Sequence, residues 1–230
     1  PYTTAVGTTF DTGEFETVLQ MGKDKADWNG FAARKAASKA QGKLRGLGLT
    51  YYVEIAAGGQ QEEFTEVRFT SSGKVELLIG TQSTGQGHET AYAQILADEL
   101  DIPYEAITVI QGDTDRIAQG NGTGGSRSIH VGGGAVIEGA KTAIEEAKPI
   151  AAHLLEADDD ELDYQDGNIP VRGTNRGISM MDLGQSAADP QNLPQELQEK
   201  YPNGFSVKAK YEGTHPSFPN GCHIAEIEID

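Results

Sequence analysis

The chain has 230 residues, of which 37% are hydrophobic and 23% are charged, and its formal net charge is −17. This composition allows a buried core, whereas the negative charge argues against binding to nucleic acids or anionic membranes, which proteins contact mainly through Lys and Arg. A single cysteine, Cys222, excludes an internal disulfide and any multi-cysteine metal site built from this chain alone, so we expect a reducing, cytoplasmic setting.

The first eighty residues predict two helices followed by three strands. Asp11 and Glu14 have the spacing of a helix capping box, and residues 28–43 are rich in the helix formers Ala, Lys and Arg. Strands rich in apolar and β-branched residues are expected at 47–53, 64–70 and 74–79. The last two are separated by Ser71-Ser72-Gly73, which favours a hairpin and therefore a small antiparallel sheet.

Two further helices are expected in the middle of the chain, each preceded by a glycine-rich loop. Apolar residues between Tyr92 and Leu100 mark one face of the first helix. A strand at 107–110 and the second loop lead into a long helix, with a kink or a stop expected at Pro149. Three consecutive glycines at 132–134 cost that helix about 1 kcal/mol each relative to Ala, so we expect the helix to be closely packed there.

The C-terminal third is less regular. A hairpin is expected at 162–171 with its turn at Asp166-Gly167, residues 184–194 are rich in loop formers, and residues 205–211 predict a strand. Apolar and polar residues alternate from Ile224 to Asp230 as in an unfinished strand. We therefore expect the chain to be a segment of a longer protein.

Together these elements predict an α+β fold in which small mixed or antiparallel sheets pack with helices. No internal repeat or low-complexity linker divides the chain, and no stretch approaches the roughly 20 apolar residues that a membrane span needs. We expect one domain fragment over residues 1–230, with room for two lobes at about 1–156 and 157–230.

The two glycine-rich loops have the composition of anion-binding sites. Glycines let backbone N–H groups approach a phosphate, and the start of a helix adds unpaired N–H donors and the positive end of the helix dipole. Arg127 would add one full positive charge, whereas Glu89 would repel an anion. The candidate ligand-binding residues are Thr84, Gly85, Gln86, Gly87, His88, Thr123, Gly124, Gly125, Ser126, Arg127 and Ser128. Taken alone, each loop is also typical of a tight connection without a ligand.

Other phosphate and metal motifs are not matched. No Gly-Lys-Ser or Gly-Lys-Thr ends either loop, which argues against a P-loop enzyme. The glycine spacing does not fit a dinucleotide-binding βαβ unit, although Asp113 lies at a plausible distance. The five histidines are dispersed, and only His215 with Cys222-His223 hints at a metal cluster, so we assign no metal ligand to this chain.

The loops and their surroundings resemble one enzyme family. Residues 80–95, 112–115 and 122–128, which include Gly85-Gln86-Gly87-His88 and Ser126-Arg127-Ser128, are similar to the large subunit of xanthine dehydrogenase-family molybdenum hydroxylases. Within that family the similarity is greatest to the aerobic carbon monoxide dehydrogenases. The helix leading into Gly46–Glu54 also resembles the family, so the resemblance covers nearly the whole chain.

The resemblance implies that the Gly85-Gln86-Gly87 element, Ser126 and Ser128 contact the pyranopterin and phosphates of a molybdopterin dinucleotide, with cytosine as the expected nucleotide. It also implies a molybdenum ion that oxidises carbon monoxide or hydroxylates a carbonyl- or imine-type carbon with oxygen from water. In the family the general base is a glutamate of a Gly-Glu motif that lies beyond Asp230. We therefore assign no catalytic residue to this chain and expect it to be inactive alone.

The resemblance further implies partners: an FAD-binding medium subunit and an iron–sulfur small subunit, assembled as a dimer of heterotrimers. Two alternatives stay open. The first alternative is that the chain is a non-catalytic scaffold or binding module of the same fold. The second is that it belongs to an unrelated nucleotide-binding enzyme with similar loops. A Gly-Glu motif downstream and a cofactor loop upstream in the same reading frame would support the molybdenum enzyme.

Overall fold

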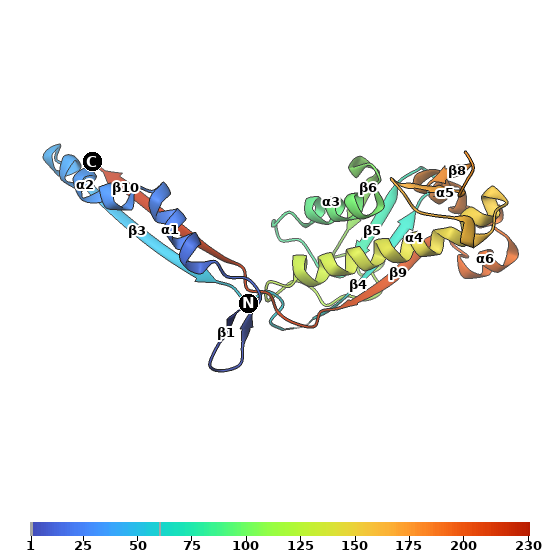
Figure 1. The fold of residues 1–230 in the computed structure, drawn as a ribbon, viewed down its shortest axis with the longest axis horizontal. Coiled ribbons are helices and arrows are strands. Elements are labelled where there is room, and N and C mark those ends of the chain that lie inside the picture. Colours follow the sequence, from blue (N-terminus) through green and yellow to red (C-terminus); the bar gives the residue numbers. More distant parts are fainter. Residues whose placement is uncertain (1, 60) are drawn as a thin grey trace. The chain divides into compact units, whose positions relative to one another are not determined.

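The computed structural model describes residues 2–59 and 61–230, and the chain forms two compact units (Figure 1). One unit consists of Pro1–Ala56 together with Pro216–Asp230, and the other of Ala57–His215. Both contain helices packed on small sheets, in agreement with the predicted α+β class.

The two units do not follow the expected lobes at 1–156 and 157–230. Apolar side chains from residues 162–207 lie in the same hydrophobic core as those from residues 67–151, so the C-terminal third is part of the larger unit. The last fifteen residues instead return to the N-terminal unit, because their strand pairs with a strand near the start of the chain. Such long-range pairing leaves no local signal in the sequence.

The smaller unit is built on one long antiparallel strand pair. β3 (Leu44–Val53) pairs with β10 (Asn220–Ile229) over ten residues, which confirms the strand predicted near the C-terminus. α1 (Phe15–Lys25) packs against β10, and α2 (Phe31–Ala40) packs against β3. The remaining elements are a 3-10 turn at Trp28–Gly30 and the short strands β1 (Tyr2–Thr3) and β2 (Thr9–Phe10).

The predicted capping box at the start of α1 is wrong. Glu14 occupies the N-cap position, and no side chain caps the helix. Asp11 instead accepts hydrogen bonds from the hydroxyl of Ser217 at 2.6 Å and from the backbone N–H of Phe218 at 2.9 Å. These bonds tie the N-terminal segment to the residues that precede β10, because a tertiary donor has replaced the local one.

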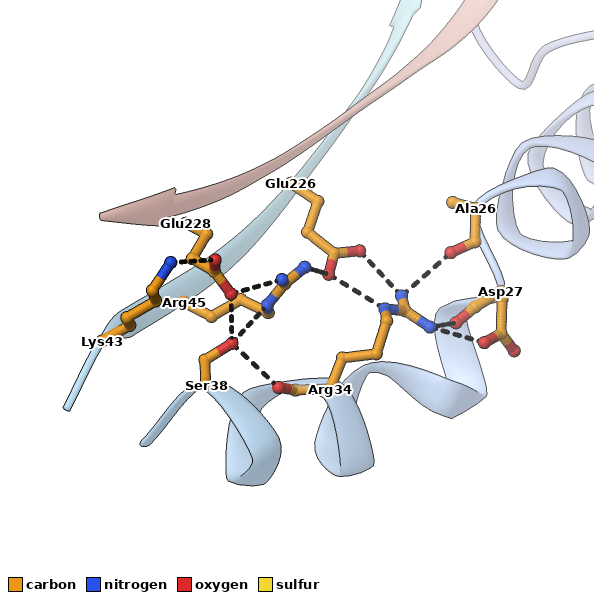
Figure 2. Close-up of polar contacts among 8 residues, drawn as sticks. All are labelled: Ala26, Asp27, Arg34, Ser38, Lys43, Arg45, Glu226 and Glu228. Carbon is orange, nitrogen blue, oxygen red and sulfur yellow. Dashed lines mark hydrogen bonds and ion pairs between the residues drawn. The ribbon is translucent and has the colours of Figure 1, made fainter. Parts of the chain in front are cut away.

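A network of charged residues joins α2, β3 and β10 in the smaller unit (Figure 2). Arg34 donates to both carboxylate oxygens of Glu226, at 2.9 and 2.7 Å. Arg45 bridges Glu226 and Glu228 at 2.6 Å each, and the hydroxyl of Ser38 donates to Glu228 at 2.6 Å. Hydrogen bonds from Arg34 and Arg45 lower the pKa of Glu226 to about 2, and those from Ser38 and Arg45 lower the pKa of Glu228 to about 2.

The larger unit contains a four-stranded mixed sheet in the order β6-β5-β4-β9. β4 and β5 form the predicted hairpin, β9 pairs antiparallel with β4, and β6 lies parallel to β5. The strands are β4 (Glu62–Phe69), β5 (Val75–Ile79), β6 (Ile107–Ile110) and β9 (Ser206–Glu212). The parallel pair places the carboxyl ends of β5 and β6 side by side.

Two helices, α3 (His88–Leu100) and α4 (Gly133–Leu155), cover one side of this sheet. Every second residue of β4 from Glu63 to Phe69 is buried on that side, as expected for a strand with one covered face. The opposite side carries charged residues, among them Arg68, which pairs with Glu66 at 2.7 Å. α3 connects the parallel strands β5 and β6, so the loop before it lies at their carboxyl end.

The three consecutive glycines lie where α4 is packed most closely, as predicted. A Cβ atom on Gly132 would lie 2.5 Å from the hydroxyl of Tyr92 in α3, and one on Gly134 would lie 2.8 Å from the ring of Tyr211 in β9. Gly132 ends one turn of π-helix, Ser128–Gly132, that leads into α4. Of the kink or stop expected at Pro149, the stop does not occur, since α4 continues through this residue to Leu155.

The last part of the larger unit contains short elements that pack on the far end of α4. Asp166 and Gly167 form the predicted hairpin turn, both with positive φ. Residues 184–194 are more regular than predicted, because Ser179 caps a helix that extends into them. The elements here are β7 (Asn168–Pro170), β8 (Gly177–Ser179), α5 (Met180–Ala187), α6 (Gln195–Lys200) and 3-10 turns at Asp159–Glu161 and Pro190–Asn192; an earlier 3-10 turn at Tyr104–Ala106 precedes β6.

Candidate functional site

The two predicted loops meet at a single surface hollow of about 340 Å³ in the larger unit. The loop before α3 and the loop before the π-helical turn that leads into α4 both open onto it, and both helices begin at the same end of the unit (Figure 1). The hollow is lined by Gln86, His88, Thr123, Gly124, Ser126, Arg127, Ser128 and Ile129. Seven of the eleven predicted residues line this hollow, although the two loops are about forty residues apart in the sequence. The other four, Thr84, Gly85, Gly87 and Gly125, belong to the same loops but do not line it.

The first loop exposes its backbone to solvent at the start of α3. Gly85 and Gly87 have φ values of +99° and +78°, and a Cβ atom on either would point into open space. Gly87 is the N-cap of α3, and no side chain caps this helix. Gln86 turns its carbonyl oxygen towards Thr84, whose backbone N–H donates to it at 2.5 Å. This contact orients the amide nitrogen of Gln86 as the outward-facing donor.

The second loop is anchored to the first through Thr123. Its hydroxyl donates to the backbone oxygen of Gln82 at 2.7 Å, accepts from the N–H of the same residue at 3.0 Å, and lies 3.2 Å from the hydroxyl of Ser128. Gly125 and Ser126 follow in the left-handed region, with φ values of +59° and +52°. A left-handed serine is uncommon, and such backbone is concentrated at ligand-binding sites.

The buried side of the second loop rests on an ion pair that the sequence did not indicate. Arg127 donates to Glu63 of β4 at 2.6 Å and to the backbone oxygen of Gly122 at 2.6 Å, and it also donates to the backbone oxygen of Glu62. Arg127 is 4% exposed and Glu63 is fully buried. The charge of Arg127 is therefore matched within the protein, and this residue braces the loop where we had expected it to offer a charge to a phosphate.

A buried hydrogen-bond chain connects the two loops behind the hollow. The hydroxyl of Tyr92 donates to the backbone oxygen of Ser128 at 2.8 Å and lies 3.1 Å from the hydroxyl of Thr81. The amide nitrogen of Gln111 lies 2.7 Å from the hydroxyl of Thr81 and 3.3 Å from Nδ1 of His88. Gln111 directly follows β6, and Thr81 is the second residue after the end of β5. That position at neighbouring strand ends is the signal that could have identified them.

The arrangement suits an anionic ligand and shows no metal cluster. Two uncapped helix starts present backbone N–H groups, and the side chains of Gln86 and Ser128 add neutral donors. Within residues 2–59 and 61–230, no three His, Cys, Asp or Glu side chains are grouped as a metal site would require. No helix in the same ranges is long and apolar enough to cross a membrane.

Curated relatives match the entire chain. It is 32% identical over its full length to the large chain of carbon monoxide dehydrogenase from Hydrogenophaga pseudoflava, of which it covers 30%. It is 30% identical to the large subunit of nicotine 6-hydroxylase from Paenarthrobacter nicotinovorans, of which it covers 29%. The chain thus spans about 30% of the length of these relatives, as expected for a segment of a longer subunit.

Solved structures show the same fold over the whole chain. The carbon monoxide dehydrogenase of Oligotropha carboxidovorans superposes with a TM-score of 0.76 at 28% identity, and the quinoline 2-oxidoreductase of Pseudomonas putida 86 with a TM-score of 0.78 at 28% identity. The chain covers 30% of each of those structures. A family model described as a molybdopterin cofactor-binding domain matches residues 21–230. The chain belongs to this family of molybdopterin cofactor-binding domains.

Proposed function

We propose that this chain holds the phosphate groups of a molybdopterin dinucleotide within a larger molybdenum oxidoreductase subunit. The observation that carries the proposal is the hollow in which two glycine-rich helix starts converge. Because the loops come from separate parts of the chain and are joined through Thr123, their convergence is difficult to explain as two independent tight connections.

The donors around the hollow fit a diphosphate. Gly85, Gly87 and Gly124 have open space where a side chain would stand, so the backbone is accessible to a large anion. Gln86 and Ser128 add neutral donors at the rim. In a chain with a net charge of −17, a ligand with two negative charges needs such local donors and helix dipoles.

The bound group would supply the redox chemistry of its molybdenum, while the residues of this chain bind and orient its phosphate end. The relatives are named for oxidation of carbon monoxide and hydroxylation of nicotine, so we assign this chain to an oxidation that uses carbon monoxide, an aldehyde or a heterocycle, with oxygen from water. None of the carboxylates Glu89, Asp113 and Asp115 lines the hollow, and we place the catalytic base elsewhere in the full subunit.

The same proposal includes the remaining parts of the enzyme. We place this chain in the large subunit of a cytoplasmic complex with an FAD-binding subunit and an iron–sulfur subunit, arranged as a dimer of heterotrimers, and with cytosine as the cofactor's nucleotide. The relatives support a multisubunit assembly, because they are named as large subunits and as a subunit of a dehydrogenase complex.

The test uses the full subunit that contains this segment. Gln86→Ala and Ser126→Ala are expected to lower the molybdenum content of the purified protein more than its melting temperature, since each removes a hydrogen bond to a charged group and spares the core. Gln94→Ala and Ser71→Ala, at exposed positions away from the hollow, serve as matched controls. Equal molybdenum content in all four variants and the wild type would refute the proposal and support a non-catalytic module of the same fold.

A further inference from the structure

His88 combines burial with an unpartnered nitrogen at the wall of the hollow. The side chain is only 4% exposed, yet it lines the hollow between the two loops. Its Nδ1 atom faces Gln111, whereas its Nε2 atom has no hydrogen-bond partner among the described residues. In residues 2–59 and 61–230, the only side-chain polar atoms that are both fully buried and unpartnered belong to Gln61 and Gln111. Since Nε2 has no partner either, it is not fully buried and reaches the surface. That surface is the hollow.

The orientation of the Gln111 amide follows from its contacts. One end of the amide lies 3.0 Å from the backbone oxygen of Thr81, which only accepts hydrogen bonds, so this end is the nitrogen. The other end, Oε1, is buried and has no donor among the described residues, and an NH₂ group there would leave two donors unsatisfied. Gln111 therefore presents its amide nitrogen, and not an oxygen, to Nδ1 of His88.

This orientation determines which ring nitrogen of His88 carries the proton. A proton on Nδ1 would point at the amide nitrogen of Gln111, 3.3 Å away, which cannot accept a hydrogen bond, whereas a bare Nδ1 can share one hydrogen of that amide with Thr81. Thr81 reinforces the arrangement: its hydroxyl is held by Tyr92 on one side and by Gln111 on the other. The neutral ring consequently has its proton on Nε2, which faces the hollow.

The surroundings of His88 favour its neutral form. Burial lowers the pKa of His88, and the neighbouring Glu89 carboxylate opposes this effect. The other ionisable groups nearby are Tyr92, whose ring centre lies 5.2 Å away, and Arg127, which lines the hollow and is paired with Glu63. A neutral Nε2–H is a hydrogen-bond donor that needs no counter-charge.

We propose that Gln111 is a positioning residue that fixes His88 with its proton on Nε2, so that His88 donates a hydrogen bond to a phosphate oxygen of the ligand in the hollow. The inference rests on the proposed function for the identity of the ligand as a diphosphate ester. It adds Gln111 to the site, although this side chain does not line the hollow.

The test combines NMR with ligand binding. Dimethyl diphosphate is the probe, because a diphosphate diester keeps the same charge between pH 5 and 8, and ¹⁵N-histidine labelling of the chain resolves five residues. In the wild type we expect the His88 proton on Nε2 and an affinity that is constant from about pH 6 to 8. In Gln111→Glu the carboxylate attracts a proton to Nδ1, so at pH 8 we expect Nε2 to be bare and the affinity to fall about tenfold.

A double-mutant cycle separates positioning from simple destabilisation. His88→Ala should lower the wild-type affinity about tenfold but have little further effect in the Gln111→Glu background at pH 8, because the same hydrogen bond is already lost. Gln94→Glu, an exposed position on α3 with the same change of charge, is the control. Unchanged His153 resonances in α4 report that each variant is folded.

Two outcomes are distinguishable. If the wild type does not bind dimethyl diphosphate, the proposed function and this inference both fail. If it binds while His88 carries its proton on Nδ1, or if the losses in His88→Ala and Gln111→Glu add, the proposed function stands and the role of Gln111 is overturned. Gln111→Leu gives a further check, because it removes the amide without adding a charge. In this variant the proton of His88 should be shared between both ring nitrogens, and the loss of affinity should be smaller than in Gln111→Glu.

Discussion

The ion pair between Glu63 and Arg127 is expected to determine whether the second loop keeps its shape. Both side chains are buried, and their charged atoms lie 2.6 Å apart. Glu63→Gln removes the carboxylate that lies against the guanidinium of Arg127, and breaking a buried pair in this way costs about 3–5 kcal/mol. Because 1 kcal/mol shifts the melting temperature of a domain of this size by about 2–4 °C, we expect melting to occur about 6–20 °C lower.

Urea unfolding followed by circular dichroism measures this loss. The double variant Glu63→Leu/Arg127→Met is expected to recover part of it, since removing both charges together avoids an unpaired buried ion. The control is Glu138→Gln, which breaks an exposed pair with Lys141 and should cost little, because solvent screens such pairs. If Glu63→Gln costs no more than this control, the reasoning that the loop depends on the buried pair is refuted.

Three further predictions concern the rest of the chain. The folded-state pKa values of Glu226 and Glu228 are about 2, below their unfolded values. Their network should therefore stabilise the smaller unit fully above about pH 5 and lose this effect as the pH falls towards 2. Glu226→Gln should flatten that part of the acid-unfolding curve. Gly80→Ala should lower the melting temperature, since its Cβ atom would lie 2.1 Å from Cα of Gly120. Gly124→Ala has open space for its Cβ atom, so it should leave the melting temperature unchanged and weaken only diphosphate binding. The isolated chain, supplied with molybdopterin dinucleotide and a dye acceptor, should not oxidise carbon monoxide or aldehydes above the free-cofactor blank, because it has no assigned base.

Local patterns in the sequence predicted most elements of this fold. The strand β4 and the turn at Asp166-Gly167 depend on neighbouring residues, and both appear where expected. The errors arose where distant residues compete with local ones. Asp11 bonds to Ser217 and Phe218, more than 200 positions away. The helix α4, where we expected a kink or a stop at Pro149, does not stop there, because its apolar face is packed in the core.

The candidate site divides in the same way. The glycine loops and their donors were recognisable because helix starts and glycines are local features, and the structure brings them together. Glu63 could not be identified, since a Glu-Glu pair in a strand predicts exposed residues, and its partner Arg127 is 64 positions away. The same ion pair changes the interpretation of Arg127, from a charge offered to the ligand to a brace for the loop that binds it.

That change has a measurable consequence for salt dependence. A site that binds a diphosphate through an available arginine loses affinity as salt rises, because screening weakens the attraction. Among the described residues that line this hollow, Arg127 is the one cation of fixed charge, and it is paired with Glu63, while the chain as a whole carries −17. Screening should then mainly reduce repulsion, and the affinity for dimethyl diphosphate should stay constant or rise between about 50 and 300 mM NaCl. A titration series in which affinity falls severalfold over this range would show that Arg127 leaves Glu63 and contacts the ligand directly, whereas a flat or rising series would support binding by backbone N–H groups and neutral side chains.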